Sequence, residues 1–191
     1  MADTGKDYIV WESFRTGDEK AFSSIFNSYV QELYKYGIKF SSDEELVKDS
    51  IQELFIKIYS NRNSLGTTDN IRFYLFKALK RRLIDELSRL QNTVSLSTMS
   101  LPFEVEGSPE DQDEEWEQIV RKKKLKNALS HLSPRQREAI YLRYDAEMSL
   151  EQIAELLDMN YQSTRNLIHR GIEKLRKLIL LPSLFIFFLI F

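Results

Sequence analysis

The chain has 191 residues, of which 42% are hydrophobic, so it is long enough to fold into one or two compact domains. It contains no cysteine, which excludes disulfides, thiolate metal sites and a cysteine nucleophile, and fits a reducing compartment such as the cytoplasm. Six Gly and four Pro leave few helix breakers, so we expect an all-α protein, and the first residues carry no secretory signal pattern.

The net charge of −2 conceals a strong asymmetry along the chain. Residues 1–91 carry 14 basic and 14 acidic side chains, residues 92–118 carry eight acidic and no basic ones, and residues 119–191 carry 13 basic and seven acidic ones. A neutral block, an acidic tether of net charge −8 and a basic block of net charge +6 indicate two domains. The basic block points to a polyanionic partner such as nucleic acid.

Helical periodicity dominates the first part of the chain. Apolar residues recur at helical spacing through residues 6–40 and again through residues 43–62. Ser42 and Glu45 match a capping box that would begin the second of these segments. Residues 61–70 are rich in Asn, Ser, Gly and Thr and are predicted to form a loop.

A further helix is predicted over residues 71–90, where leucines recur at helical spacing. Its buried stripe comprises Leu75, Leu79, Leu83, Leu87 and Leu90. The following residues, 92–118, contain two prolines and the acidic run without a sustained period, so they are interpreted as an extended linker.

The C-terminal part contains a pair of helices with the spacing of a helix-turn-helix. Residues 149–158 form a short predicted helix that begins with a capping box, Ser149 to Gln152, and a break at “DMN” precedes a longer helix. The inner face of the short helix comprises Ile153, Ala154 and Leu157. Asn160 is expected to cap the longer helix. In such motifs the first turns of the second helix contact DNA bases in the major groove.

The longer helix presents amides, hydroxyls and guanidinium groups on one side, with no carboxylate before Glu173. Amides pair with adenine, arginine pairs with guanine, and hydroxyls contact either bases or phosphates. The expected base-reading residues are Gln162, Ser163, Arg165, Asn166, His169 and Arg170. Of these, His169 is expected to contact a phosphate rather than a base. Further basic residues that would neutralise phosphates are Arg121–Lys124, Lys174, Arg176 and Lys177.

Two stretches resemble one known family. Residues 132–176, from “LSPRQREAIYLRY” to “IEKLR”, closely resemble region 4 of the sigma-70 family of transcription initiation factors. Independently, “DSIQELFIKIY” (49–59) resembles a signature of sigma region 2, and residues 70–89 resemble the segment that follows it. Two matches in this order, with a short linker and no region 3, are similar to the compact extracytoplasmic-function (ECF) group.

The resemblance implies an all-α chain with two helical domains joined by an acidic flexible linker. The expected parts are a region 2 helical bundle at 8–91, the linker at 92–118, a region 4 helix-turn-helix domain at 119–181 and an apolar tail at 182–191.

The resemblance also implies binding to core RNA polymerase, through its β′ clamp and β flap. The positions that correspond to the clamp-docking face are Asp49, Gln52 and Glu53. Their spacing of three and four residues places them on one face of a helix. The residues alone favour a solvated acidic stripe, and the resemblance is what favours docking.

By the same resemblance, the loop at 61–70 and the helix after it melt and read the minus-10 promoter element. A melted strand needs base-sized pockets, stacking rings and a cationic track. The expected strand-contacting residues are Arg72, Lys77, Lys80 and Arg81. Phe73, Tyr74 and Phe76 are the available rings, although aromatic residues on a helix more often pack in the core. Gln162, Ser163, Arg165, Asn166, His169 and Arg170 would then read the minus-35 element.

Four residues depart from the usual region 4 pattern. They are Asp158 where glycine is common, Thr164 in place of valine, Leu167 at a usually polar position and Gly171 in place of alanine. Asp158 tolerates the left-handed conformation of the turn, and the hydroxyl of Thr164 is expected to bond back to a carbonyl. Gly171 costs roughly 1 kcal/mol inside a helix unless another group packs very close to it.

Two segments leave alternatives open. The acidic run “EDQDEEWE” (110–117) is a solvated tether or, in the free protein, folds onto Arg121–Lys124 or the DNA-facing helix. The apolar stretch 178–191 is interrupted by Pro182 and is shorter than the ~20 residues of a membrane span. It packs on the second domain as a strand or helix, binds a partner, or makes shallow membrane contact.

We therefore interpret the chain as an ECF-type sigma factor of the cytoplasm that brings core RNA polymerase to promoter DNA. No nucleophile–base pair, phosphate loop or paired acids stand out, and neither histidine has a second ligand at useful spacing, so no enzyme activity, metal or cofactor is expected. The resemblance adds an anti-sigma protein as an expected partner. The alternatives are an ordinary helix-turn-helix regulator and a membrane-peripheral helical interaction protein that uses its apolar tail.

Overall fold

The computed structural model describes the backbone of residues 4–90, 102–104 and 116–189, and the side chains of residues 5–89, 102–104 and 120–179. Within these residues every regular element is a helix, which confirms the all-α prediction. The chain divides into two compact units, Met1–Leu101 (unit 1) and Pro102–Phe191 (unit 2).

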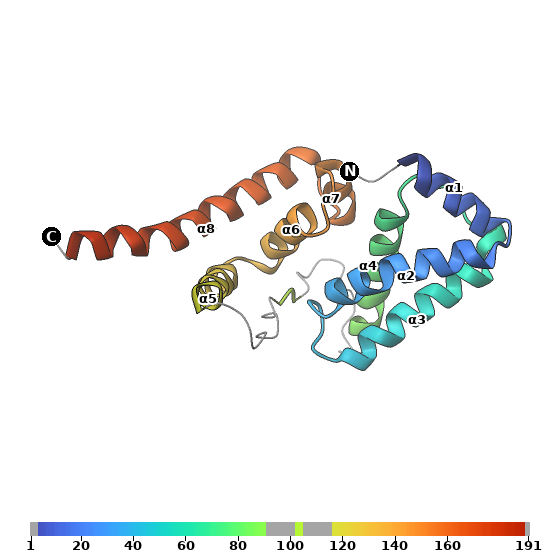
Figure 1. Cartoon of the computed structure of the whole chain (residues 1–191), viewed down its shortest axis with the longest axis horizontal. Helices are drawn as coiled ribbons and strands as arrows, with labels where there is room; N and C mark the ends of the chain where they lie inside the picture. Colours follow the sequence, from blue (N-terminus) through green and yellow to red (C-terminus); the bar gives the residue numbers. More distant parts are fainter. Residues whose placement is uncertain (1–3, 91–101, 105–115, 190–191) are drawn as a thin grey trace. The chain divides into compact units, whose positions relative to one another are not determined.

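The described residues of unit 1 form the α-helices labelled α1 to α4 in Figure 1 and one short 3₁₀ turn. They are α1 (Thr4–Arg15), α2 (Glu19–Gly37), α3 (Glu44–Ser60), η1 (Arg62–Ser64) and α4 (Ile71–Leu90). Residues 6–40 form two helices rather than one, because Gly17 adopts a φ of 102° that ends α1, and Asp18 then caps α2 through the backbone N–H groups of Lys20 and Ala21.

The start of α3 differs from the sequence prediction. The helix begins at Glu44, and its cap is Asp43, whose carboxylate accepts a hydrogen bond from the backbone N–H of Leu46 at 3.1 Å. The predicted capping box from Ser42 to Glu45 is therefore wrong by one residue. Asp and Ser are about equally good caps, so the two neighbouring positions are hard to separate from sequence.

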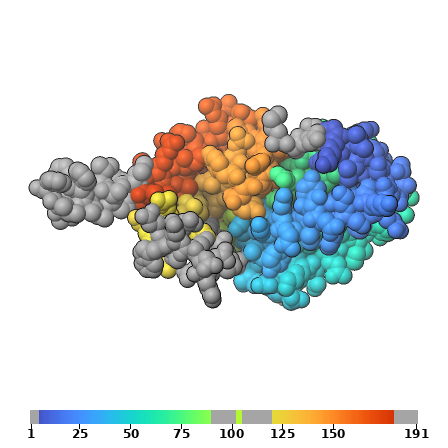
Figure 2. Space-filling view, viewed as in Figure 1, coloured from blue at the N-terminus to red at the C-terminus, as the bar shows by residue number. Residues whose placement is uncertain are grey.

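A single core joins α1, α2, α3 and α4. Its fully buried side chains include Trp11, Leu33, Tyr36, Val47, Leu75, Leu79 and Leu83. At Gly37 an added Cβ would lie 2.6 Å from Cγ1 of Val47, so α2 and α3 approach as closely as only glycine allows. The two helices run side by side in Figure 1, and their side chains form one continuous surface in Figure 2.

Unit 2 is built around its last helix. Its helices are α5 (Trp116–Ser130), α6 (Pro134–Tyr144), α7 (Leu150–Leu156) and α8 (Tyr161–Leu189). α5, α6 and α7 each pack against α8. Both α6 and α7 begin with a complete capping box, from Ser133 to Gln136 and from Ser149 to Gln152, and the second of these confirms the predicted start of α7.

Phe103 lies inside the predicted linker but belongs to the core of unit 2. Its side chain is 2% exposed, and its ring centroid lies 5.8 Å from that of Tyr141 in α6. Nε of Arg137 donates to the carbonyl of Phe103 at 2.5 Å. Residues 105–115 carry most of the acidic run, and so the hypothesis that this run contacts Arg121–Lys124 lies outside the described residues.

The apolar tail continues the last helix. The backbone of α8 is helical through Pro182 to Leu189. The side chains from residue 180 onward lie outside the described part of the chain. The three alternatives for the tail, which are packing on unit 2, binding of a partner and membrane contact, therefore also lie outside the described residues. No helix among the described residues combines the length and apolar composition that crossing a bilayer requires.

Candidate functional site

The α7–α8 pair has the geometry of a helix-turn-helix. Ile153 and Ala154 of α7 are buried, and Asp158 in the turn has a φ of 51°, as expected for a left-handed residue. The side-chain carbonyl of Asn160 accepts a hydrogen bond from the backbone N–H of Ser163 at 2.8 Å and so caps α8. The caps and the turn together fix where the first exposed turns of α8 begin.

The polar side of α8 faces solvent over its first three turns. All six residues expected to read DNA are exposed: Gln162, Ser163, Arg165, Asn166, His169 and Arg170. The opposite side is buried through Thr164, Ile168 and Gly171. The exposed side thus presents donors and positive charge, with one local carboxylate, because Oε2 of Glu173 lies 3.7 Å from Nδ1 of His169.

Two departures from the family pattern have a direct structural reason. The hydroxyl of Thr164 donates to the carbonyl of Asn160 at 3.0 Å, so this buried polar group is satisfied. An added Cβ at Gly171 would lie 2.8 Å from Cδ1 of Ile140 in α6. The glycine therefore allows α6 and α8 to approach closely, which offsets its low helix propensity.

Part of the positive charge of unit 2 is used inside the fold. Arg135 donates to the carbonyl of Leu157 at 2.7 Å, and Arg143 donates to the carbonyl of Met148 at 2.8 Å. Nζ of Lys174, which was expected to contact a phosphate, donates to the carbonyl of His131 at 2.6 Å. The sequence predicted a basic domain. It could not show which of the basic side chains donate to backbone carbonyls and stabilise the turns between the helices.

The three candidate polymerase-contacting residues share the exposed side of α3. Asp49, Gln52 and Glu53 are all exposed. Glu53 is also bound to Arg82 of α4, whose guanidinium lies within an ion-pair distance of Glu86 as well. One of the three residues is therefore tied to a neighbouring helix, while Asp49 and Gln52 belong to the surface of α3.

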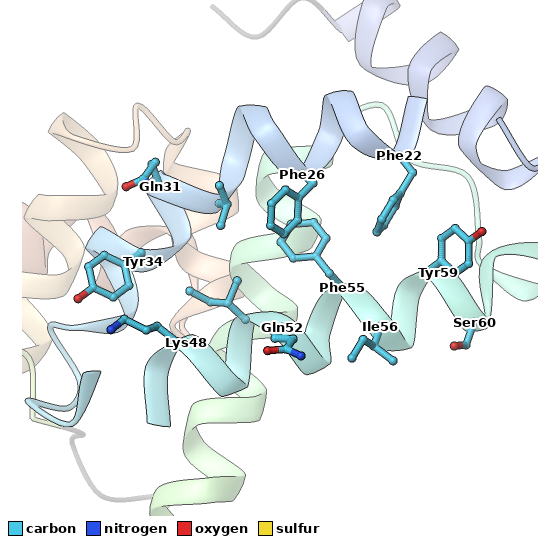
Figure 3. Close-up of a pocket in the computed structure, with 12 residues that line it drawn as sticks. Phe22, Phe26, Gln31, Tyr34, Lys48, Gln52, Phe55, Ile56, Tyr59 and Ser60 are labelled. Carbon is cyan, nitrogen blue, oxygen red and sulfur yellow. The ribbon is translucent and has the colours of Figure 1, made fainter. Parts of the chain in front are cut away.

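Sequence reasoning missed an apolar groove beside these residues. Between α2 and α3 lies a groove of about 820 Å³, and Gln52 is part of its wall. In Figure 3 the rings of Phe22 and Phe26 from α2 and of Phe55 and Tyr59 from α3 lie along it. Phe26 and Ile56 remain 37% and 55% exposed. The sequence signal for the groove was Ile56, an apolar residue that does not belong to the buried stripe of α3.

The four candidate minus-10 contacts differ in their surroundings. Arg72 forms an ion pair with Glu32 of α2 at 3.0 Å, and Nζ of Lys77 lies 6.0 Å from the ring centroid of Phe73. Lys80 is half-buried and Arg81 is exposed. Three of the four thus line one stretch of α4, whereas the guanidinium of Arg72 is held against α2.

The aromatic residues of α4 are mostly packed. Phe76 is buried and lies 4.8 Å from the ring of Tyr36, and the ring of Tyr74 lies 4.9 Å from that of Trp11. Burial raises the pKa of Tyr74. Phe73 is half-buried, so it is the ring of the three that combines accessibility with a neighbouring cation. No group of His, Asp and Glu suited to hold a metal ion occurs among the described residues.

Comparisons with known proteins match both units to one family. Residues 25–93 match the family described as Sigma-70 region 2, and residues 122–175 match the family described as Sigma-70, region 4. Together these stretches cover more than half of the chain, in the order expected from the sequence.

Full-length relatives agree with this match. The ECF RNA polymerase sigma factor SigW of Bacillus subtilis is 27% identical over 175 residues, which cover 85% of this chain and 91% of the relative. The RNA polymerase sigma factor CarQ of Myxococcus xanthus is 24% identical over 169 residues, which cover 88% of this chain and 94% of the relative.

Two solved structures share the fold. One is CnrH in complex with the cytosolic domain of CnrY, with a TM-score of 0.60 and 18% identity over 91% of this chain and 96% of that one. The other is the sigma factor RpoE of Bartonella quintana in complex with the anti-sigma factor NepR, with a TM-score of 0.62 and 21% identity over 84% of this chain and 97% of that one.

Proposed function

The chain belongs to the sigma-70 family, in its ECF group, and we infer that it is a transcription initiation factor that binds core RNA polymerase and directs it to specific promoters. The observation that carries this conclusion is the presence of both sigma regions, in order, on one chain. A region 4 match alone would also fit an ordinary helix-turn-helix regulator. The additional region 2 match is not expected in such a regulator.

We propose that α8 reads the minus-35 element in the major groove. The support is the exposure of Gln162, Ser163, Arg165, Asn166, His169 and Arg170 over the first turns of a capped second helix. Arg165 and Asn166 are the residues best suited to base edges, because bidentate arginine and amide groups discriminate between bases. His169 is the residue proposed for a phosphate contact, and the carboxylate of Glu173, 3.7 Å from its Nδ1, disfavours a phosphate beside that nitrogen.

We propose that unit 1 binds the polymerase through α3 and reads the melted minus-10 strand through the loop at 61–70 and α4. For the polymerase, Asp49, Gln52 and Glu53 supply the polar contacts, and the apolar groove between α2 and α3 supplies buried area. For the strand, Lys77, Lys80 and Arg81 supply the cationic track. Arg72 contributes to the strand only if it leaves Glu32.

The polymerase performs the chemistry, so we propose that the protein is not itself an enzyme and acts in the cytoplasm with the polymerase. An anti-sigma protein is a further proposed partner, since both structurally similar complexes contain one partner chain and one of them is named as an anti-sigma factor. Such a partner would compete with the polymerase for the exposed surfaces of this chain.

The deciding experiment is transcription in a purified system. Core polymerase with this protein should initiate at a defined site on a promoter selected from a randomised duplex library, and core polymerase alone should not. A regulator of another class would bind the same DNA without giving core polymerase this ability, and that result would reject the proposed function.

A further inference from the structure

Helix α1 holds the loop between α3 and α4 at two points. The buried indole of Trp11 donates from Nε1 to the carbonyl of Gly66 at 2.9 Å, across 55 positions of sequence. One turn earlier, Oδ2 of Asp7 accepts a hydrogen bond from the backbone N–H of Ile71 at 3.0 Å, at the first residue of α4. The spacing of four residues places both groups on one face of α1.

Further contacts hold both anchors in place. The ring centroid of Trp11 lies 5.4 Å from that of Phe14 and 4.9 Å from that of Tyr74 in α4. Oδ1 of Asp7 lies 3.5 Å from the hydroxyl of Tyr29 in α2. Burial and the charge of Asp7 raise the pKa of Tyr29 to about 12, so its hydroxyl stays protonated and can donate to that carboxylate.

Between these two anchors the loop has little support of its own. After η1 no regular secondary structure occurs until α4. Between Gly66 and Asn70 the hydrogen bonds within the loop link Thr68 with Asn70, at 3.2 and 3.3 Å, and at the end of the loop Oδ1 of Asn70 accepts from the backbone N–H of Phe73 at 2.8 Å. Gly66, Thr67 and Asp69 are exposed. The position of such a loop depends on the elements that bind it, and here α1 binds it at Gly66 and at Ile71.

We propose that α1 positions the minus-10 reading loop through Trp11 and Asp7, and is thereby a determinant of which minus-10 bases the protein accepts. The proposal rests on the function proposed above, in which the loop at 61–70 receives bases of the melted strand. A site that discriminates between bases must hold its groups within a fraction of an ångström, and supporting residues supply that accuracy. Trp11 and Asp7 are positioning residues, because they touch the loop and not the DNA.

The variants separate positioning from general stability. Trp11→Phe keeps an aromatic ring in the core but removes the donor to Gly66. Asp7→Ala removes the acceptor for Ile71 at a half-buried surface position, so it tests the second anchor without opening the core. Leu33→Val is the control, because it removes apolar volume from a fully buried position of the same unit and has no polar group to offer the loop.

The measurement is the ratio of initiation on the parental promoter to initiation on a substituted promoter, for each reconstituted holoenzyme. The parental promoter is the one selected by the parental holoenzyme, and the substituted promoters carry single changes in the minus-10 or the minus-35 element. A variant that is only less stable lowers the active concentration on every template equally and leaves each ratio unchanged. Thermal melts by circular dichroism show which variants are folded, and if Trp11→Phe is not, Asp7→Ala decides.

We expect Trp11→Phe and Asp7→Ala to reduce discrimination at minus-10 positions by roughly fivefold or more, the size of one lost base contact, with minus-35 discrimination unchanged. Leu33→Val should leave both ratios as in the parent. The proposal would be overturned if both α1 variants kept the minus-10 ratios of the parent. It would also be overturned if Leu33→Val changed the minus-10 ratios as much as the α1 variants do. A parental protein that supports no promoter-dependent initiation would show instead that the proposed function is wrong, and the positioning proposal would fall with it.

Discussion

Gly171 shows how a single residue couples two helices. Alanine is better than glycine in a helix by roughly 1 kcal/mol, yet here its Cβ would lie 2.8 Å from Cδ1 of Ile140. Ile140→Val removes that methyl group and leaves room. We therefore expect Gly171→Ala to stabilise the protein by about 0.5–1 kcal/mol in the Ile140→Val background and to give no such gain in the parent. Chemical denaturation of the four proteins of this double-mutant cycle measures the difference, and equal effects in both backgrounds would contradict the close contact.

Arg165 and Arg176 lie on the same exposed helix but should act differently on DNA. Both are exposed, Arg165 in the second turn of α8 and Arg176 three turns later. Arg165→Ala should cost roughly 1–3 kcal/mol on the selected minus-35 duplex and little on a scrambled one, as expected for a base contact. Arg176→Ala should weaken binding to both duplexes alike and lower the salt dependence of binding. Titrations of full-length protein at two salt concentrations distinguish them, and an unchanged affinity would remove Arg165 from the reading residues.

At the scale of one element, the start of α3 offers a matched pair of neighbours. The carboxylate of Asp43 caps the helix through the backbone N–H of Leu46, whereas Ser42 lies one residue outside. We expect Asp43→Ala to lower the free energy of unfolding by about 1 kcal/mol and Ser42→Ala to leave it nearly unchanged. Thermal or denaturant unfolding of the two variants gives the comparison. The reverse order of effects would restore the capping box that the sequence suggested.

The accuracy of sequence-based prediction followed the range of the interactions. The capping box at Ser149 and the cap at Asn160 are local, because cap and helix lie within three residues, and both were predicted correctly. Contacts between distant positions left no such pattern. The bond from Trp11 to Gly66 and the burial of Phe103 within an acidic stretch depend on which helices meet, and neither periodicity nor composition carries that information.

The candidate site followed the same division. Exposure of the α8 residues was predictable, because the buried stripe through Thr164, Ile168 and Gly171 fixes which side faces outward. The partners of the basic residues were not, since net charge does not tell a cation that contacts solvent from one bound to a carbonyl, as Arg135 and Arg143 are. The ion pair of Arg72 with Glu32 was likewise not predictable from net charge.

At the scale of the whole molecule, the proposed function requires two separable activities, one in each unit. Unit 1 would hold the polymerase and unit 2 the minus-35 duplex, so a change on α3 should affect the first activity and spare the second. The double variant Gln52→Lys with Glu53→Lys replaces a neutral and an acidic group with two cations on one helix face. We expect it to weaken binding to core polymerase by tenfold or more, roughly the cost of placing like charges in an interface.

Glu53 complicates this test, because it also binds Arg82 of α4. The Glu53→Lys substitution removes that ion pair and places an ammonium group beside the guanidinium, so the packing of α3 on α4 is a second route to any loss of binding. Arg82→Ala provides the control: it breaks the same pair but leaves the acidic side of α3 intact, so it should keep polymerase affinity if Glu53 acts at the interface. Affinity for core polymerase and for the minus-35 duplex should be measured on all full-length variants. If Arg82→Ala loses as much polymerase binding as the double variant, Glu53 acts through the packing of α3 on α4. If the double variant also loses binding to the minus-35 duplex, the two activities are not separable.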